Sequence, residues 1–376
     1  MAPTGRSDQT RTPLWVVGVG AVLHLTGLTR PRFATERARP VAQRLGKDQP
    51  ESAGEGAKAN AGTDRGRSAT SPAEIPAKGW KDILLRIYHG ISEDRIVATA
   101  AGVTFFVLLA LFPGIAGLIA LYGLYADAQS IGQHLNTVAG ILPEGGIQIV
   151  RDQIERLTSQ PAQRLGLATV LGLGLSLWSA NGGMKAMFDA LNVVYHEKEK
   201  RSFVKLNAVS LTFTLGAIAF VLLALATITV LPAALSYLGL SRVTELVIKI
   251  GRWPVLILVV IFAIALIYRF GPSRDKPQWR WITPGSIFAA AGWLGASLLF
   301  SWYAENFGSY NETYGSLGAA IGFMTWLWLS TIVILVGAKL NAETEHQTVR
   351  DSTEGRPRPL GQRGAQMADT VGHAHA

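Results

Sequence analysis

The most constraining feature of this sequence is a series of long apolar runs that hold few or no charged residues. Six of them are long enough to be membrane spans, at about 96–126, 165–190, 206–238, 250–269, 281–304 and 313–338. About 20 apolar residues in a helix cross a hydrocarbon core about 30 Å thick. The fourth run spans only if Arg252 and Arg269 extend their side chains to the headgroups. The sequence therefore predicts an all-α integral membrane protein, a bundle of six transmembrane helices.

Composition agrees with this class. Charged residues make up 16% of the chain, against about 25% in a typical soluble protein. The chain has 10 Trp and 40 Gly, residue types that suit membrane interfaces and close helix packing. It has no cysteine, so a disulfide framework and a thiolate metal site are excluded.

Basic residues predict the orientation of the spans. Twelve Lys and Arg residues lie immediately before the first span and in the second and fourth connections, and six lie in the other connections. Lys and Arg accumulate on the cytoplasmic side of short loops. Both termini are therefore expected in the cytoplasm, and the net charge of +9 indicates anionic lipid rather than nucleic acid as the partner.

Outside the spans, the composition predicts tails and interfacial helices. Residues 1–79 are expected to be a disordered basic tail with a weak apolar segment at 13–28, and 346–376 a disordered C-terminal tail, which leaves 80–345 as the membrane domain. Residues 80–89 form an amphipathic helix, lying in the headgroup plane or capping the bundle. Two further amphipathic helices, or a plain packed loop, are expected between the first two spans.

The amphipathic pattern at 80–89 also predicts which side chains share a face. Trp80, Leu84, Ile87 and Tyr88 fall on the apolar side, with Lys81 and Arg86 opposite.

Polar residues at the second span form the first candidate site. These candidate bundle residues are Asn181, Lys185, Asp189 and Asn192. Asn181 and the two glycines after it are expected to interrupt the helix, and Lys185 and Asp189 have the i,i+4 spacing of an ion pair. A broken helix beside a charge pair is a device by which transporters expose backbone to a cargo. The alternative is that the pair marks the wet end of an ordinary helix.

A second candidate site is the short acidic and aromatic connection before the last span. Its residues are Glu305, Asn306, Asn311, Glu312 and Tyr314, with no cation among residues 305–314. They predict an outward-facing mouth that attracts cations or polar headgroups. A tightly turned, solvated loop is the alternative.

No sequence motif indicates catalysis. The chain lacks a phosphate-binding Gly-rich loop followed by Lys-Ser/Thr, a His-Glu-x-x-His motif and a nucleophile elbow. We therefore expect no enzyme, no catalytic residue, no cofactor and no metal.

Several motifs resemble the YihY/BrkB family of bacterial inner-membrane proteins, formerly labelled ribonuclease BN. The motifs lie at 100–113, 177–187, 191–195, 281–285, 314–318 and 337–343. The resemblance covers about residues 80–347 and implies six spans and a cytoplasmic-membrane address. Lys339 departs from the family pattern, which usually has Glu there. The ribonuclease label is generally regarded as mistaken, so the resemblance implies no settled biochemical role.

Three functional hypotheses follow. The favoured one is transport, or lipid or envelope handling, across the bacterial cytoplasmic membrane, motivated by the polar second span. The alternative is a non-catalytic scaffold for envelope assembly, and a ribonuclease acting on tRNA is the least favoured. Membrane lipids are the expected partners, a homo-oligomer is compatible with the sequence, and nucleic acid is not expected.

Overall fold

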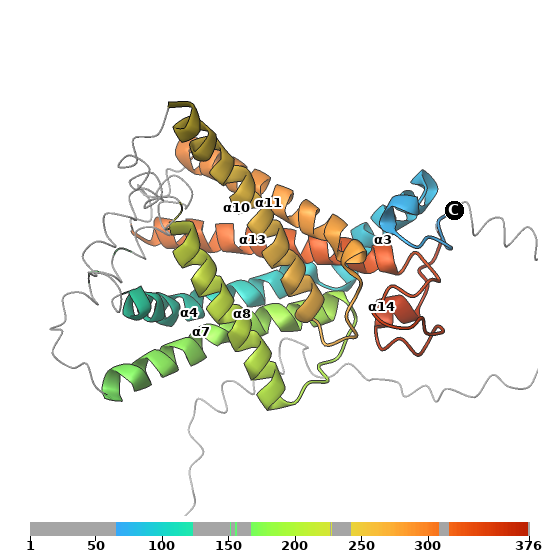
Figure 1. Ribbon diagram of the computed structural model, residues 1–376, viewed down its shortest axis with the longest axis horizontal. Helices are drawn as coiled ribbons and strands as arrows, with labels where there is room; N and C mark the ends of the chain where they lie inside the picture. Colours follow the sequence, from blue (N-terminus) through green and yellow to red (C-terminus); the bar gives the residue numbers. More distant parts are fainter. Residues whose placement is uncertain are drawn as a thin grey trace, which may run out of the picture. The chain divides into compact units, whose positions relative to one another are not determined.

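In a computed structural model, residues 65–122, 151, 155, 167–225, 227, 242–307 and 316–374 are described. They belong to one compact unit, Gly54–Ala376. The predictions for 13–28 and for the amphipathic helices of the first external connection lie outside the described residues, apart from positions 151 and 155. The helices are η1 (Pro72–Glu74), α3 (Ala77–Glu93), α4 (Ile96–Tyr122), α7 (Leu167–Val194), α8 (Phe203–Leu225), α10 (Arg242–Phe270), α11 (Trp279–Phe307), α13 (Ser316–Glu345) and α14 (Gln366–Asp369) (Figure 1).

Five helices of the described chain are long and apolar enough to cross a membrane. Their apolar segments are Ile96–Ile115, Phe203–Ala224, Ile250–Phe270, Trp279–Tyr303 and Ala320–Glu345. The helix α7 has 28 residues but is not among them, because its polar and glycine residues lower its hydropathy. The all-helical class is thus confirmed for the described residues, together with five of the predicted spans.

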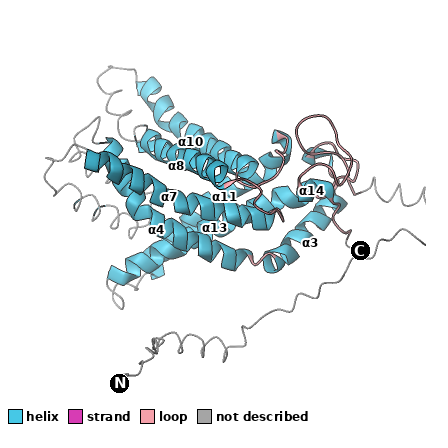
Figure 2. Cartoon of the chain, turned by 90° about the horizontal axis from the view of Figure 1, so that it is seen from below, coloured by secondary structure: helices cyan, strands magenta, loops and turns pink. Residues whose placement is uncertain are grey.

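The long helices pack in pairs around α13. α4 lies along α7, α11 lies along α13, and α13 also packs against α4 (Figures 1 and 2). α8 packs chiefly on α7, and α10 chiefly on α11. The main core includes Val103, Leu191, Tyr268 and Leu335, all buried. Large apolar side chains elsewhere on these helices, such as Leu258 and Leu298, are exposed, as expected for surfaces that face lipid.

One end of the bundle is polar, and the segments predicted to be cytoplasmic meet there. Arg201, between α7 and α8, donates to the carbonyls of Phe270 and Gly271 at the end of α10. Arg274, between α10 and α11, pairs with Glu345 at the end of α13. We call this region the polar end. These connections join α7 to α8 and α10 to α11. α13 ends beside them at Glu345, and α4 begins next to Asp94, which contacts His196 after α7.

The C-terminal segment differs from the predicted disordered tail. Residues 346–374 are described, and Met367 lies in the main core. The buried Arg363 donates to the carbonyls of Val349, Arg350 and Ala368. The prediction of disorder rested on the low hydrophobicity of this segment. The segment is instead held mainly by hydrogen bonds between polar side chains and backbone.

The segment before α3 also differs from the predicted tail. Arg65 pairs with Asp82 at 2.8 Å, and Ile75 is buried. The amide of Val349 donates to the Arg67 carbonyl at 2.9 Å, which ties this segment to the C-terminal one. Residues 65–79 therefore belong structurally with the membrane domain.

The amphipathic helix is confirmed as α3, but its faces differ from the prediction. Leu84 and Tyr88 are 59% and 73% exposed, whereas Ile83 and Arg86 are buried. Arg86, predicted on the wet side, bonds to Glu343 on α13. The packed face of α3 combines this ion pair with Ile83 and Ile87, the latter as predicted. α3 therefore caps the bundle and still presents apolar side chains outward.

Candidate functional site

The helix α7 runs without interruption through the glycine pair that was predicted to break it. It spans Leu167–Val194, so the predicted interruption at Asn181-Gly182-Gly183 is wrong. A Cβ on Gly183 would lie 3.2 Å from the Cα of Val107 on α4. The glycine therefore serves close packing between α4 and α7, which is a common use of small residues in membrane helices.

A line of polar side chains lies between α7 and α8. It consists of Asn181 and Lys185 on α7 and Asn207, Ser210 and Thr214 on α8. Thr214 donates to Asn181 Oδ1 at 3.2 Å, and Lys185 Nζ donates to Asn207 Oδ1 at 3.1 Å. Asn181, Asn207, Ser210 and Thr214 are buried. We call this line the polar seam.

Asn181 is the buried centre of the seam. Its amide nitrogen lies 3.5 Å from Asn207 Oδ1, while its oxygen accepts from Thr214. The α8 residues recur at i, i+3 and i+7, which places them on one helical face. The α7 half of this seam was predicted from the sequence. The α8 half was not, although its i, i+3 and i+7 spacing is visible in the sequence.

Lys185 and Asp189 do not form the predicted pair. Asp189 is exposed, and Lys185 turns to Asn207 and lies 5.3 Å from the centre of the Trp178 ring. Asn207 belongs to the second turn of α8, so Lys185 lies level with the start of that helix. This placement agrees with the alternative in which the two charges lie near the wet end of a helix.

Asn192 lies apart from the polar seam, at the polar end. Its oxygen accepts from the amide of Ser273 at 2.7 Å, and its nitrogen donates to Glu199 at 3.1 Å. Burial alone would raise the pKa of Glu199, but the Arg201 guanidinium at 2.7 Å and its amide lower it to about 2. Asn192 therefore joins two connections at the polar end and does not line the seam.

The predicted outer mouth is only partly within the described residues. Glu305 and Asn306 belong to the last turn of α11. Asn311, Glu312 and Tyr314 lie outside the described residues, so the outer mouth stays a prediction.

A chain of buried charges, which the sequence analysis missed, crosses the polar end. Arg86 Nε lies 2.6 Å from Glu343, Glu343 lies 3.0 Å from Lys339, and Lys339 lies 2.7 Å from Asp94. Asp94 in turn contacts His196 at 2.8 Å. Lys339, which departs from the family pattern, is 2% exposed. The charge chain links α3, α13 and the end of α7.

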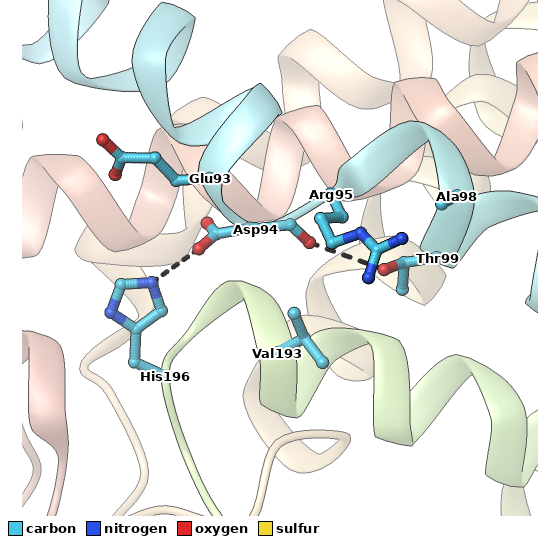
Figure 3. Close-up of a pocket in the computed structure, with 7 residues that line it drawn as sticks. All are labelled: Glu93, Asp94, Arg95, Ala98, Thr99, Val193 and His196. Carbon is cyan, nitrogen blue, oxygen red and sulfur yellow. Dashed lines mark hydrogen bonds and ion pairs between the residues drawn. The ribbon is translucent and has the colours of Figure 1, made fainter. Parts of the chain in front are cut away.

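An open pocket of about 610 Å³ lies at the outer end of the charge chain (Figure 3). Its lining residues are Glu93, Asp94, Arg95, Ala98, Thr99, Val193 and His196. Arg95 and His196 have φ values of 52° and 55°, because each follows the last residues of a helix and closes it in the left-handed conformation. These two helix ends aim the Asp94 carboxylate at the His196 ring (Figure 3).

Asp94 is anionic in this arrangement. Burial alone would raise the pKa of Asp94, but the hydrogen bond from His196 and the ammonium of Lys339 hold it below its ordinary value. Among the residues that the structure describes, no three His, Cys, Asp or Glu converge as metal ligands. Ion pairs along the charge chain can instead hold α3, α13 and the end of α7 together.

Comparison with known proteins identifies the family. The family model described as virulence factor BrkB matches residues 87–360, which is well over half of the chain. The chain belongs to this family. It is 31% identical to the putative ribonuclease-like protein YfkH of Bacillus subtilis over 252 residues, covering 65% of this chain and 88% of that protein.

Other relatives are named only as membrane proteins. A UPF0761 membrane protein of Methylibium petroleiphilum is 23% identical, over 70% of this chain and 62% of the relative. One of Idiomarina loihiensis is 25% identical, over 68% of this chain and 87% of the relative. No solved structure matches the chain. A membrane protein of the BrkB family is thus established, without a specific role.

Two motifs of this BrkB-family protein meet in the structure. A Cβ on Gly285 would lie 2.1 Å from the Gly337 carbonyl oxygen, so α11 and α13 touch through backbone. Pro284 disturbs the hydrogen bonds of α11. Asn341 from α13 accepts from the Gly285 amide at 2.7 Å and donates to the Ile282 carbonyl at 3.0 Å. Both motifs therefore serve one helix contact.

Proposed function

We propose that this protein is a six-span protein of the bacterial cytoplasmic membrane that moves or handles a lipid or another polar envelope component. The spans would be α4, α7, α8, α10, α11 and α13, because each is long and has one terminus at the polar end. The basic residues of the connections there support a cytoplasmic position for that end and for both termini.

The polar seam is the observation that carries this proposal. Polar groups at membrane depth are costly and are usually retained for function. The seam places two asparagines, a serine and a threonine in the buried contact between α7 and α8, with Lys185 at one end. Such a line offers hydrogen bonds to a polar headgroup that could not otherwise enter the hydrocarbon.

The packing of α8 makes the seam an interface that can open. α8 contacts chiefly α7, and large side chains on its other faces, such as Val221 and Leu223, are exposed. Separation of this one helix pair would expose the polar side chains and leave α4, α11 and α13 in place.

Scaffolding for envelope assembly is the second candidate. The observation that favours it is the charge chain, in which Arg86, Glu343, Lys339 and Asp94 satisfy one another and hold the polar end rigid. Ribonuclease activity, which the name of the Bacillus relative mentions, is least supported, because no three His, Asp or Glu side chains converge for metal-assisted hydrolysis among the described residues.

Reconstitution in liposomes tests the proposal. Lipids with a headgroup fluorophore are quenched by an external, membrane-impermeant reductant only in the outer leaflet unless a protein moves them between leaflets. We expect the wild type to make the inner leaflet accessible, and Asn181→Leu combined with Thr214→Val to abolish this. The control is Thr212→Val, because Thr212 is exposed and bonds only the Ala208 carbonyl of its own helix.

Quenching that is the same with wild-type protein and with empty liposomes, across lipids of different headgroup, would overturn lipid movement. The scaffold would then be the better reading.

A further inference from the structure

Lys185 is a cation with unused hydrogen-bonding capacity at the end of the polar seam. An ammonium has three N–H donors, and one of them goes to Asn207 Oδ1 at 3.1 Å. Among the described residues, no carboxylate lies within ion-pair distance of Lys185, and Asp189 is exposed. Within the described part of the chain, the partly buried ammonium therefore forms no ion pair.

The surroundings of Lys185 are aromatic and open to the outside. The Trp178 ring, 5.3 Å from the ammonium, is 50% exposed. Phe203 contacts that ring with the centroids 6.3 Å apart, and Phe203 and Val204 are 70% and 76% exposed. Trp is the side chain that membrane interfaces favour, with an apolar body and a polar tip.

This surface lies where the charged connection between α7 and α8 meets the apolar helix α8. Phe203 is the first residue of α8, and the connection before it carries Lys198, Lys200 and Arg201. Lys200 and Arg201 are paired with Glu197 and Glu199, whereas Lys185 is not. The exposed aromatic side chains thus begin where the charged connection ends.

From this geometry we infer that Lys185, Trp178, Phe203 and Asn207 form a binding site for an acidic phospholipid. The ammonium would hold the phosphate group, since Lys binds phosphate as a point charge. Asn207, which itself bonds the Phe203 carbonyl, would keep the ammonium in place. The exposed faces of Trp178 and Phe203 would hold the glycerol and the first part of the acyl chains. The inference rests on the proposed function and names its substrate class, a lipid with a net negative headgroup.

Thermal melting of the purified full chain in neutral detergent tests the site. Phosphatidylglycerol, added in mixed micelles, should raise the melting temperature of the wild type, and phosphatidylcholine at the same ratio should raise it less. For Lys185→Gln the rise with phosphatidylglycerol should be less than half that of the wild type. Lys198→Gln removes one positive charge from the neighbouring connection and should keep the full rise.

Equal rises for the wild type and for Lys185→Gln would overturn the site. A loss of the same size in Lys198→Gln would also overturn it, because the binding would then follow net charge alone. Inorganic phosphate or glycerol 3-phosphate that protects as well as the lipid would overturn the assignment to phospholipid.

A second measurement keeps the site separate from the proposed function. Trp178 is one of 10 Trp residues, so lipid carrying a brominated acyl chain should quench less fluorescence in Trp178→Leu than in the wild type. Quenching that depends on Trp178 and Lys185, without movement of lipid in liposomes, would support the binding site and contradict the proposed lipid transport. Movement of lipid that is unchanged in Lys185→Gln would support the proposed transport and contradict the binding site.

Discussion

At the scale of single residues, Lys339 shows how the polar end tolerates buried charge. Its ammonium lies 2.7 Å from Asp94 and 3.0 Å from Glu343, and Gly90 leaves the space for its side chain, since a Cβ there would lie 2.4 Å from Lys339 Cε. Lys339→Met removes the cation that Asp94 and Glu343 share and leaves them with His196 and Arg86. Losing one partner of a buried pair costs about 3–5 kcal/mol, and the contacts that remain should offset part of that cost. The melting temperature in detergent should fall sharply.

The exposed Lys198 provides the matched control for Lys339. The free energy of unfolding of Lys198→Met should lie within about 0.5 kcal/mol of the wild-type value, as is usual for surface substitutions. If Lys339→Met melts like Lys198→Met, the charge chain contributes nothing to stability.

A pH prediction follows from Glu199, whose pKa is lowered from 4.5 to about 2 in the folded protein. A lowered folded pKa means that the carboxylate stabilises the fold above pH 4.5 and that this contribution is lost as the pH falls towards 2. We expect the wild type to lose more thermal stability than Glu199→Gln between pH 5 and pH 2.5. Parallel melting curves across that range would contradict the role given to Arg201.

At the scale of elements, the sequence predicted most of the helices because membrane spans are encoded by long apolar runs. It failed at α7, where Asn181 and two glycines were taken as a break although an α-helix tolerates them when a neighbour packs closely. It also failed at Arg86, since amphipathicity reports polarity but not ion pairs made 257 residues away. The charge chain and the α8 half of the seam depend on tertiary proximity, which one sequence does not contain.

The contact between α11 and α13 yields a test at the same scale. Gly285→Ala would place a Cβ 2.1 Å from the Gly337 oxygen and 2.5 Å from Asn341, so the helices must separate. Its cost should reach the 1–3 kcal/mol typical of overpacking. Gly295→Ala, in the same helix with nothing within 4 Å, should be neutral or stabilising by up to about 1 kcal/mol. Melting of both variants in one detergent compares them directly.

At the scale of the whole molecule, the chain separates into a polar end built from charge pairs and a bundle built from apolar contact. Both described chain ends belong to the polar end, where Arg67 donates to the Gly372 carbonyl at 2.6 Å and Arg86 to the His373 carbonyl at 3.1 Å. The C-terminal segment thus covers the charge chain, which explains how a segment of low hydrophobicity is ordered. A polar end of this kind favours water over hydrocarbon, so it constrains which part of the bundle lies inside a membrane.

That constraint gives the topology test. The chain has no cysteine, so single cysteines report their own positions. Ser202, exposed in the connection before α8, lies at the polar end, where basic residues accumulate. The positive-inside rule therefore predicts a cytoplasmic position for it. With six spans, position 309, before the last span, is expected on the opposite side.

Ser309→Cys should react with a membrane-impermeant maleimide in intact spheroplasts, and Ser202→Cys only after permeabilisation. Labelling of both in intact spheroplasts would contradict six spans, and the reverse pattern would invert the orientation.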